Sequence, residues 1–117
     1  MAMNVTFKAG QVIFREGDQA DAFYVLRTGK IRITRGGVLL EEIGRDAFFG
    51  EMALIDTGGR SATATAVIET ECVEVQAADF NKRLQHLDPV MQGIFRVLVE
   101  RIRRLDRIIA KNDTTDY

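Results

Sequence analysis

Short runs of alternating apolar and polar residues, separated by glycines, fill the first two-thirds of the chain. The clearest runs cover residues 11–15, 22–27, 30–34 and 38–43. Short strands at this spacing are typical of an antiparallel roll or barrel. Gly36-Gly37 predicts a two-residue hairpin turn, and Gly17 and Gly29 mark turns that need a residue at positive φ. A second pair of strands is expected over residues 61–68 and 71–76.

After residue 76 the apolar period lengthens from two residues to about three and a half, which indicates helices. Asp79 is expected to cap a short helix that ends near Leu84. Asp88-Pro89 predicts the start of a longer helix that ends near Lys111, because Asp is a good cap and proline suits the first helical position. The apolar residues of this helix form a heptad seam at Met91, Phe95, Leu98, Ile102, Leu105 and Ile109.

The composition of the chain argues against several classes of function. The 117 residues suit one domain, and 46% are apolar, enough for a core. Sixteen basic and 17 acidic residues leave a net charge of −1, which argues against a general nucleic-acid binder. A single cysteine, Cys72, excludes an internal disulfide, and with one histidine, His86, the sequence favours neither a thiol nucleophile nor a metal site. No run reaches the ~20 apolar residues that span a bilayer, so we expect a cytoplasmic protein without membrane contact.

The loop between the two β blocks holds the candidate chemistry. Gly50 permits a sharp turn, and the residues after it favour one short helical turn. Gly58-Gly59 lets the chain swing back, so that Arg60 brings a planar fork suited to two phosphate oxygens. The Ser61 hydroxyl and the backbone N–H groups of Ser61 and Ala62 add donors, while Glu51 is an acceptor. Acceptor and donors side by side suit a ribose phosphate.

Two stretches of this chain resemble the cyclic nucleotide-binding domain family, which includes catabolite-activator-type regulators, regulatory subunits of cAMP-dependent protein kinase and cyclic-nucleotide-gated channels. The stretch similar to the family's phosphate-binding cassette is Phe49-Gly50-Glu51-x-Ala53-Leu54, followed by Arg60-Ser61-Ala62-Thr63. The stretch similar to its opening β-roll signature is Gly10-x-x-Ile13-Phe14-x-Glu16-Gly17-Asp18, followed by Phe23-Tyr24-Val25-Leu26-x-x-Gly29-x-Ile31. The nine-residue step from Glu51 to Arg60 matches the kinase and channel members.

The resemblance implies roles for individual residues. Glu51 would accept from the ribose 2′-hydroxyl and Arg60 would pair with the cyclic phosphate of cAMP or cGMP. Gly50, Met52 and Ala53 would lie where the family's backbone contacts are made, and Ser61 and Ala62 would flank the arginine. Ser61 favours neither nucleotide, since a hydroxyl at this place occurs in members of both kinds. The family binds its nucleotide without transforming it, so no catalytic residue, cofactor or metal is expected.

The resemblance also implies a single domain over residues 1–117, with a β roll over about 7–77 and hinge and lid helices over about 78–111. The expected fold class is therefore mainly β with flanking helices: an antiparallel β roll of the double-stranded β-helix or jelly-roll type, with a short cassette helix. The helix over 89–111 has two readings: a lid, with Arg104 or Arg107 stacked on the base, or the seam of a homodimer. Direct DNA binding by this chain is not expected.

Two alternatives to a nucleotide sensor remain open at this point. One is a degenerate domain of the same fold that serves interaction or dimerisation without binding a nucleotide, against which the intact Glu51 and Arg60 argue. The other is the ligand-binding fragment of a transcription regulator.

Overall fold

The structure, a computed structural model, describes the backbone of residues 2–54 and 58–115. The described side chains exclude residues 52, 54, 102, 103 and 105–115. The chain forms two compact units, Met1–Phe80 and Asn81–Tyr117.

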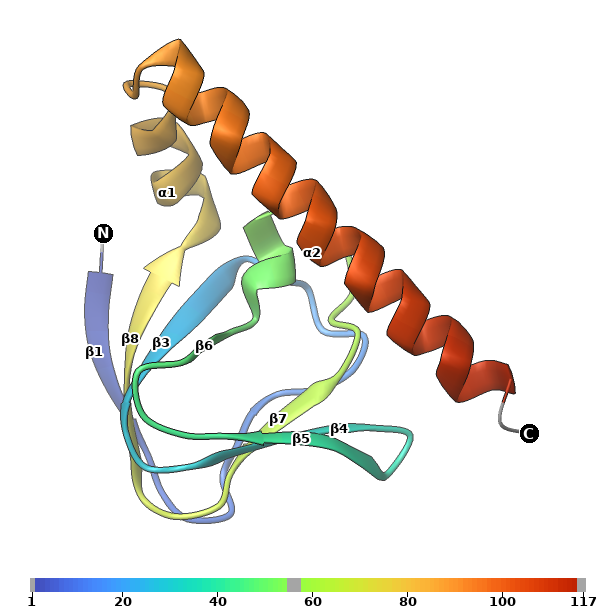
Figure 1. Ribbon diagram of the computed structural model, residues 1–117. Helices are drawn as coiled ribbons and strands as arrows, with labels where there is room; N and C mark the ends of the chain where they lie inside the picture. Colours follow the sequence, from blue (N-terminus) through green and yellow to red (C-terminus); the bar gives the residue numbers. More distant parts are fainter. Residues whose placement is uncertain (1, 55–57, 116–117) are drawn as a thin grey trace. The chain divides into compact units, whose positions relative to one another are not determined.

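The first unit is an antiparallel β roll (Figure 1). Its strands are β1 (Ala2–Phe7), β2 (Val12–Phe14), β3 (Ala22–Thr28), β4 (Ile31–Arg35), β5 (Val38–Ile43), β6 (Phe48–Phe49), β7 (Thr63–Ala66) and β8 (Thr70–Gln76). They make two four-stranded sheets, in the orders β1-β8-β3-β6 and β2-β7-β4-β5. A short 3-10 helix, η1 (Glu51–Leu54), follows β6. The predicted roll with a short cassette helix is thus confirmed.

Glycines fix two of the turns as expected. Gly36 and Gly37 both have positive φ, 57° and 79°, between β4 and β5, as a type I′ hairpin requires. Gly29 has a φ of 112°, and a Cβ there would collide with Thr70. Thr70 is fully buried, and its hydroxyl donates to the carbonyl of Ile68 at 2.8 Å. The turn before β4 therefore packs directly onto the start of β8.

The core lies between the two sheets. Its fully buried members include Leu26, Ile31, Ala64, Ala66 and Cys72. Small alanines on β7 let the sheets approach closely, while aromatic rings fill the wider part. The rings of Tyr24 and Phe49 stack with centroids 5.1 Å apart, and Phe14 lies 6.1 Å from each of them. This aromatic cluster underlies the candidate site.

Two strands were not predicted. The sequence predicts a roll that begins near Phe7, whereas β1 starts at Ala2 and pairs with β8 along its whole length. Met3, Val5 and Phe7 alternate with polar or small residues, so the period-two signal is present in the sequence. β6 has only two residues, too few for any periodicity, and its pairing with β3 defines it.

The helix after β8 is α1 (Ala77–Leu84). The prediction that Asp79 caps it was wrong, because β8 runs into the helix without a loop. The N–H of Ala77 donates to the carbonyl of Asp21 at 2.9 Å, so Asp79 falls inside the first turn. In the first unit, Phe80 packs edge-on against Phe23 with ring centroids 5.4 Å apart.

The second unit consists of the end of α1 and the long helix α2 (Pro89–Thr115). Asp88 caps α2 as predicted: its Oδ1 accepts from the N–H of Val90 at 2.8 Å. The helix continues four residues beyond the expected end at Lys111, since no glycine or proline follows to stop it.

Candidate functional site

Backbone pairing between two loops positions Arg60. Its N–H donates to the carbonyl of Asp18 at 2.7 Å, and its carbonyl accepts from the N–H of Gly17 at 2.9 Å. Gly59 packs so closely on Gly17 that a Cβ would lie 3.2 Å from the Cα of Gly17. The paired glycine loops therefore bring Arg60 back to the roll, as the sequence predicts for Gly58-Gly59.

The Arg60 guanidinium is buried in the first unit, with the whole residue only 8% exposed. Its Nη2 donates to the carbonyl of Ala22 at 2.7 Å, and its Nη1 donates to the carbonyl of Gly50 at 3.2 Å. The guanidinium carbon lies 4.1 Å from the centre of the Phe14 ring, a cation–π arrangement. The buried Nε has no hydrogen-bond partner. The fold thus holds the guanidinium through Nη1 and Nη2 and leaves Nε without a partner.

The electrostatic surroundings keep this cation charged. Burial lowers the pKa of Arg60, while Tyr24 and the carboxylates of Asp21, Asp18 and Glu51 oppose that shift. Because an arginine side chain ordinarily loses its proton only far above neutral pH, Arg60 remains a cation at pH 7. A buried cation with an unpaired donor is a good receptor for an anionic oxygen.

Gly50 makes room for the arginine. It has a φ of 74°, and a Cβ there would lie 2.9 Å from Nη1 of Arg60 and 3.3 Å from Cε2 of Phe14. A side chain at residue 50 would therefore displace the guanidinium. The glycine of the cassette is required both for the turn and for this close approach.

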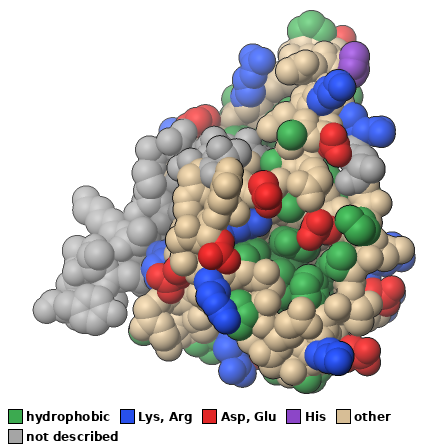
Figure 2. Space-filling model, turned by 180° about the vertical axis from the view of Figure 1, so that it is seen from behind, with side chains coloured by type: hydrophobic (Ala, Val, Ile, Leu, Met, Phe, Trp, Pro, Cys, Tyr) green, Lys and Arg blue, Asp and Glu red, His purple; other side chains and the backbone are tan. Residues whose placement is uncertain are grey.

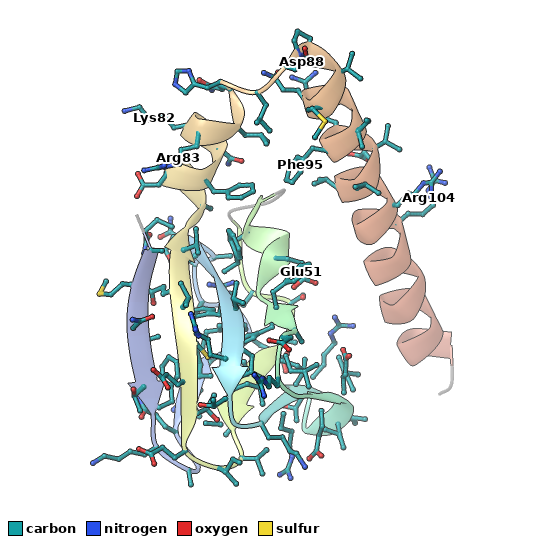
Figure 3. The ribbon with its side chains drawn as sticks, turned by 60° about the vertical axis from the view of Figure 1, so that its left-hand side comes forward. Glu51, Lys82, Arg83, Asp88, Phe95 and Arg104 are labelled. Carbon is teal, nitrogen blue, oxygen red and sulfur yellow. The ribbon has the colours of Figure 1, made fainter. Side chains whose placement is uncertain are left out.

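The short helix η1 follows Gly50 and begins with Glu51 (Figure 3). Glu51 is half-buried and lies near enough to Arg60 to favour its charged form. Ala53 is buried, and its N–H donates to the carbonyl of Gly50 at 3.1 Å, which closes the helical turn. The side chain of Met52 lies outside the described residues. Because Glu51 lies close enough to affect the pKa of Arg60, the fold brings these two side chains near each other, as the sequence predicts.

Ser61 and Ala62 follow Arg60 into β7. Ser61 is exposed, and its carbonyl accepts from Nε of Arg35 at 2.8 Å, whereas Ala62 is buried. The sequence predicts no site role for Arg35 or Phe14. Phe14 belongs to the stretch that resembles the β-roll signature, but nothing in that stretch marks it as a contact of Arg60. Only strand register places them here, since Phe14 pairs with Ala64 and Thr34 pairs with Thr63.

The two arginines proposed as lid contacts belong to the second unit. Arg104 is exposed on α2 (Figure 3), and the side chain of Arg107 lies outside the described residues.

The described part of the chain offers little support for a metal site, a membrane span or a second anion site. It holds no group of three or more His, Cys, Asp or Glu that suits a metal ion. None of its helices is both long and apolar enough to cross a membrane. A groove of about 570 Å³ opens on the roll away from the cassette, and its charged lining residues are Arg27, Arg45, Asp46 and Glu71. Because both signs are present there, the groove shows no preference for an anion.

Known proteins match this chain over most of its length. The family model for the cyclic nucleotide-binding domain matches residues 4–86. The cyclic AMP receptor protein of Thermus thermophilus is 35% identical over 105 aligned positions, and the alignment covers 86% of this chain and 49% of the relative. The cAMP-bound structure of the EAL enzyme Bd1971 is 33% identical, with a TM-score of 0.72 over 94% of this chain and 30% of that one. Its cGMP-bound structure is 33% identical, with a TM-score of 0.73 over 97% and 33%.

This chain spans half or less of the length of the first of these relatives. The family model covers well over half of the chain, and it includes every residue of the Gly50–Ala62 loop. The site described above also contains the glutamate and arginine of the cassette that the sequence shares with the family. The chain therefore belongs to the cyclic nucleotide-binding domain family.

Proposed function

We propose that this domain reversibly captures cAMP or cGMP in the loop from Gly50 to Ala62, with the cyclic phosphate on Arg60 and the ribose 2′-hydroxyl on Glu51. The unpartnered Nε of Arg60 carries the proposal. A buried donor without a partner costs about 1–3 kcal/mol, and a phosphate oxygen would remove that cost. The aromatic and backbone contacts of the guanidinium hold it ready before the ligand arrives.

The remaining cassette residues supply shape and further donors. Gly50, Met52 and Ala53 form the backbone wall beside the phosphate, and Gly50 is the member whose missing side chain makes room for Arg60. Ser61 and Ala62 flank the arginine, and the exposed Ser61 hydroxyl is free to turn toward either the phosphate or the base. Solved structures of Bd1971 with cAMP and with cGMP support treating both nucleotides as candidates.

We also propose that the segment acts as one regulatory domain and catalyses no reaction. Bd1971 is named an enzyme, but this chain covers only 30% and 33% of the chains in its cAMP-bound and cGMP-bound structures, so chemistry can reside in another part of such a protein. The nearly balanced charge of the chain supports a domain without DNA contacts. Basic and acidic side chains are interspersed on the face shown in Figure 2. The unpaired thiol of Cys72 suits a cytoplasmic setting.

For α2 we propose a switching role: the helix moves to a closed position when nucleotide binds, and Arg104 or Arg107 stacks on the base. This requires the ligand to bind the closed state more tightly than the open one. Spin-label distances between the cassette and Leu105 test it, since unchanged distances on ligand addition would contradict a lid. A homodimer through residues 89–111 is the second candidate, favoured by the exposed apolar residues Val90, Ile94 and Val97.

Calorimetric titration of the purified chain with cAMP, cGMP and 5′-AMP tests the capture itself. We expect saturable binding of at least one cyclic nucleotide, and much weaker binding of 5′-AMP, whose dianionic open phosphate does not match a cradle for a cyclic monoanion. A folded sample that shows neither heat nor a thermal shift with either cyclic nucleotide would support the degenerate interaction domain instead.

A further inference from the structure

The two sheets of the roll leave four edge strands, and unpaired edges invite pairing with another chain. Three of them carry features that discourage it. β2 has three residues and an irregular register, and β6 has two residues. β5 is longer, but it carries Glu41 and Glu42, and its register with β4 shifts between Ile33 and Thr34. Short length, charge and irregular pairing are the usual protections of an edge.

β1 has none of these protections. Its six residues pair with β8 without a register shift, and it contains neither a charged residue nor a proline. It is the outermost strand of its sheet, drawn in blue beside β8 in Figure 1. Ala2, Met3, Asn4 and Thr6 are exposed. Among the described strands, β1 is therefore the long, regular and uncharged edge.

The two faces of β1 differ, and this limits what can pair with it. Val5 lies opposite Cys72 and Phe7 lies opposite Thr70, both fully buried, so this row faces the core. The Phe7 ring packs edge-on against Tyr24 at 6.3 Å. Asn4 and Thr6 form the outer, polar row. A partner strand must present apolar residues to one row and polar residues to the other.

We propose that β1 pairs antiparallel with β1 of a second copy of this chain. Pairing centred on Val5 places Met3 opposite Phe7 of the second copy and Asn4 opposite Thr6 of the second copy. Cross-strand neighbours share a face, so this register joins apolar to apolar and polar to polar. It also covers Met3, which is 58% exposed on the core-facing row. The inference does not rest on nucleotide binding.

A pair of charge variants on the exposed outer row tests both the pairing and its register. Asn4→Lys with Thr6→Lys sets lysine opposite lysine in both cross-strand pairs. Asn4→Lys with Thr6→Glu sets lysine opposite glutamate in both. The two double variants change the same residues, and the exposed positions should leave the fold intact. Dissociation constants from sedimentation velocity of the full chain, measured up to about 1 mM, provide the comparison.

We expect the wild-type chain to self-associate, the Lys/Lys variant to associate about tenfold more weakly, and the Lys/Glu variant to match wild type within about threefold. The Ile94→Glu variant, measured in parallel, separates any association through α2. Hydrogen exchange gives a second readout that needs no substitution, because amides of β1 should gain protection as protein concentration rises. Unchanged association of the Lys/Lys variant, or β1 exchange independent of concentration, would overturn the proposal.

Discussion

Arg60 has a structural role in addition to the proposed binding role. Two side-chain hydrogen bonds tie Arg60 to the carbonyls of Ala22 and Gly50 and so join β3 to the cassette, and the face of its guanidinium lies on Phe14. A lysine at this position has no planar fork for these contacts. The sequence motif implies the ligand role alone. The structural role depends on the loop pairing between residues 17–18 and Arg60.

Replacing Arg60 should therefore reduce both affinity and stability. For Arg60→Ala we expect a loss of ~2–5 kcal/mol in cyclic nucleotide binding, or about 30-fold to several-thousand-fold. The melting temperature of the free protein should also fall, because two buried carbonyls lose a donor. Calorimetry and thermal denaturation measure the two effects.

Glu51→Ala provides the comparison. Loss of the Glu51 carboxylate removes the hydrogen bonds to the ribose hydroxyl. It should weaken nucleotide binding by ~1.5–3 kcal/mol, which is less than the loss expected for Arg60→Ala. Calorimetry on the same nucleotide measures it. If Arg60→Ala bound the cyclic nucleotide as tightly as wild type, the phosphate-binding role proposed for Arg60 would be wrong.

Cys72 should make the free energy of unfolding depend on alkaline pH. Burial raises the pKa of its thiol from 9.0 to about 11. The unfolded chain therefore releases this proton at lower pH than the folded one, so stability is full below pH 9 and falls as the pH rises toward 11. Urea denaturation should show a fall of about 2 kcal/mol across this window that Cys72→Ala lacks.

Burial also raises the pKa of Tyr24, to about 12, and Glu74 adds to the shift. The ionisation of Tyr24 affects the free energy of unfolding at higher pH, and it does so equally in wild type and in Cys72→Ala. The difference between these two proteins therefore isolates the effect of the Cys72 thiol. Parallel curves for the two proteins would contradict the assignment.

The turn between β3 and β4 depends on Gly29. Gly29→Ala forces a side chain into the left-handed region and onto Thr70, so we expect a destabilisation of at least ~2 kcal/mol. Gly44→Ala is the matched control, since that position has open space and no positive φ, and it should stay within about 0.5 kcal/mol of wild type. Chemical denaturation of both variants distinguishes a strained turn from a general loss of glycine.

Asp88 determines the start of α2. Asp88→Ala removes the acceptor for the N–H of Val90 and should cost ~0.5–2 kcal/mol in helix stability, whereas Asp88→Asn should retain most of it. The helical signal in circular dichroism, followed with temperature, measures the effect. Identical melting of all three proteins would show that the cap contributes nothing.

Sequence patterns predicted the elements whose signals are local. The hairpin at Gly36-Gly37, the strand Val38–Ile43 and the Asp88-Pro89 helix start all follow from turn or cap chemistry. The start of α1 was missed because a long-range bond to Asp21 sets it. The site shows the same division. The cassette motif marks Glu51 and Arg60 as candidates, whereas the contacts of Phe14 with Arg60 and of Arg35 with Ser61 depend on strand register.

The chain as a whole belongs to the cyclic nucleotide-binding domain family and spans half or less of its first-matched relative. Its charge is nearly balanced, its core is formed by two antiparallel sheets, and Arg60 is a buried cation beside the cassette. In the proposed function, Nε of Arg60 donates to the cyclic phosphate.

The most direct test observes that atom. In a ¹H–¹⁵N spectrum of the arginine Nε–H region, the signal lost in Arg60→Lys identifies Arg60. Saturation with the cyclic nucleotide that binds should move this signal downfield, because the Nε–H gains an anionic acceptor that the free protein lacks. Binding that saturates while the Arg60 Nε–H signal stays in place would contradict the account, since the phosphate would then be held elsewhere.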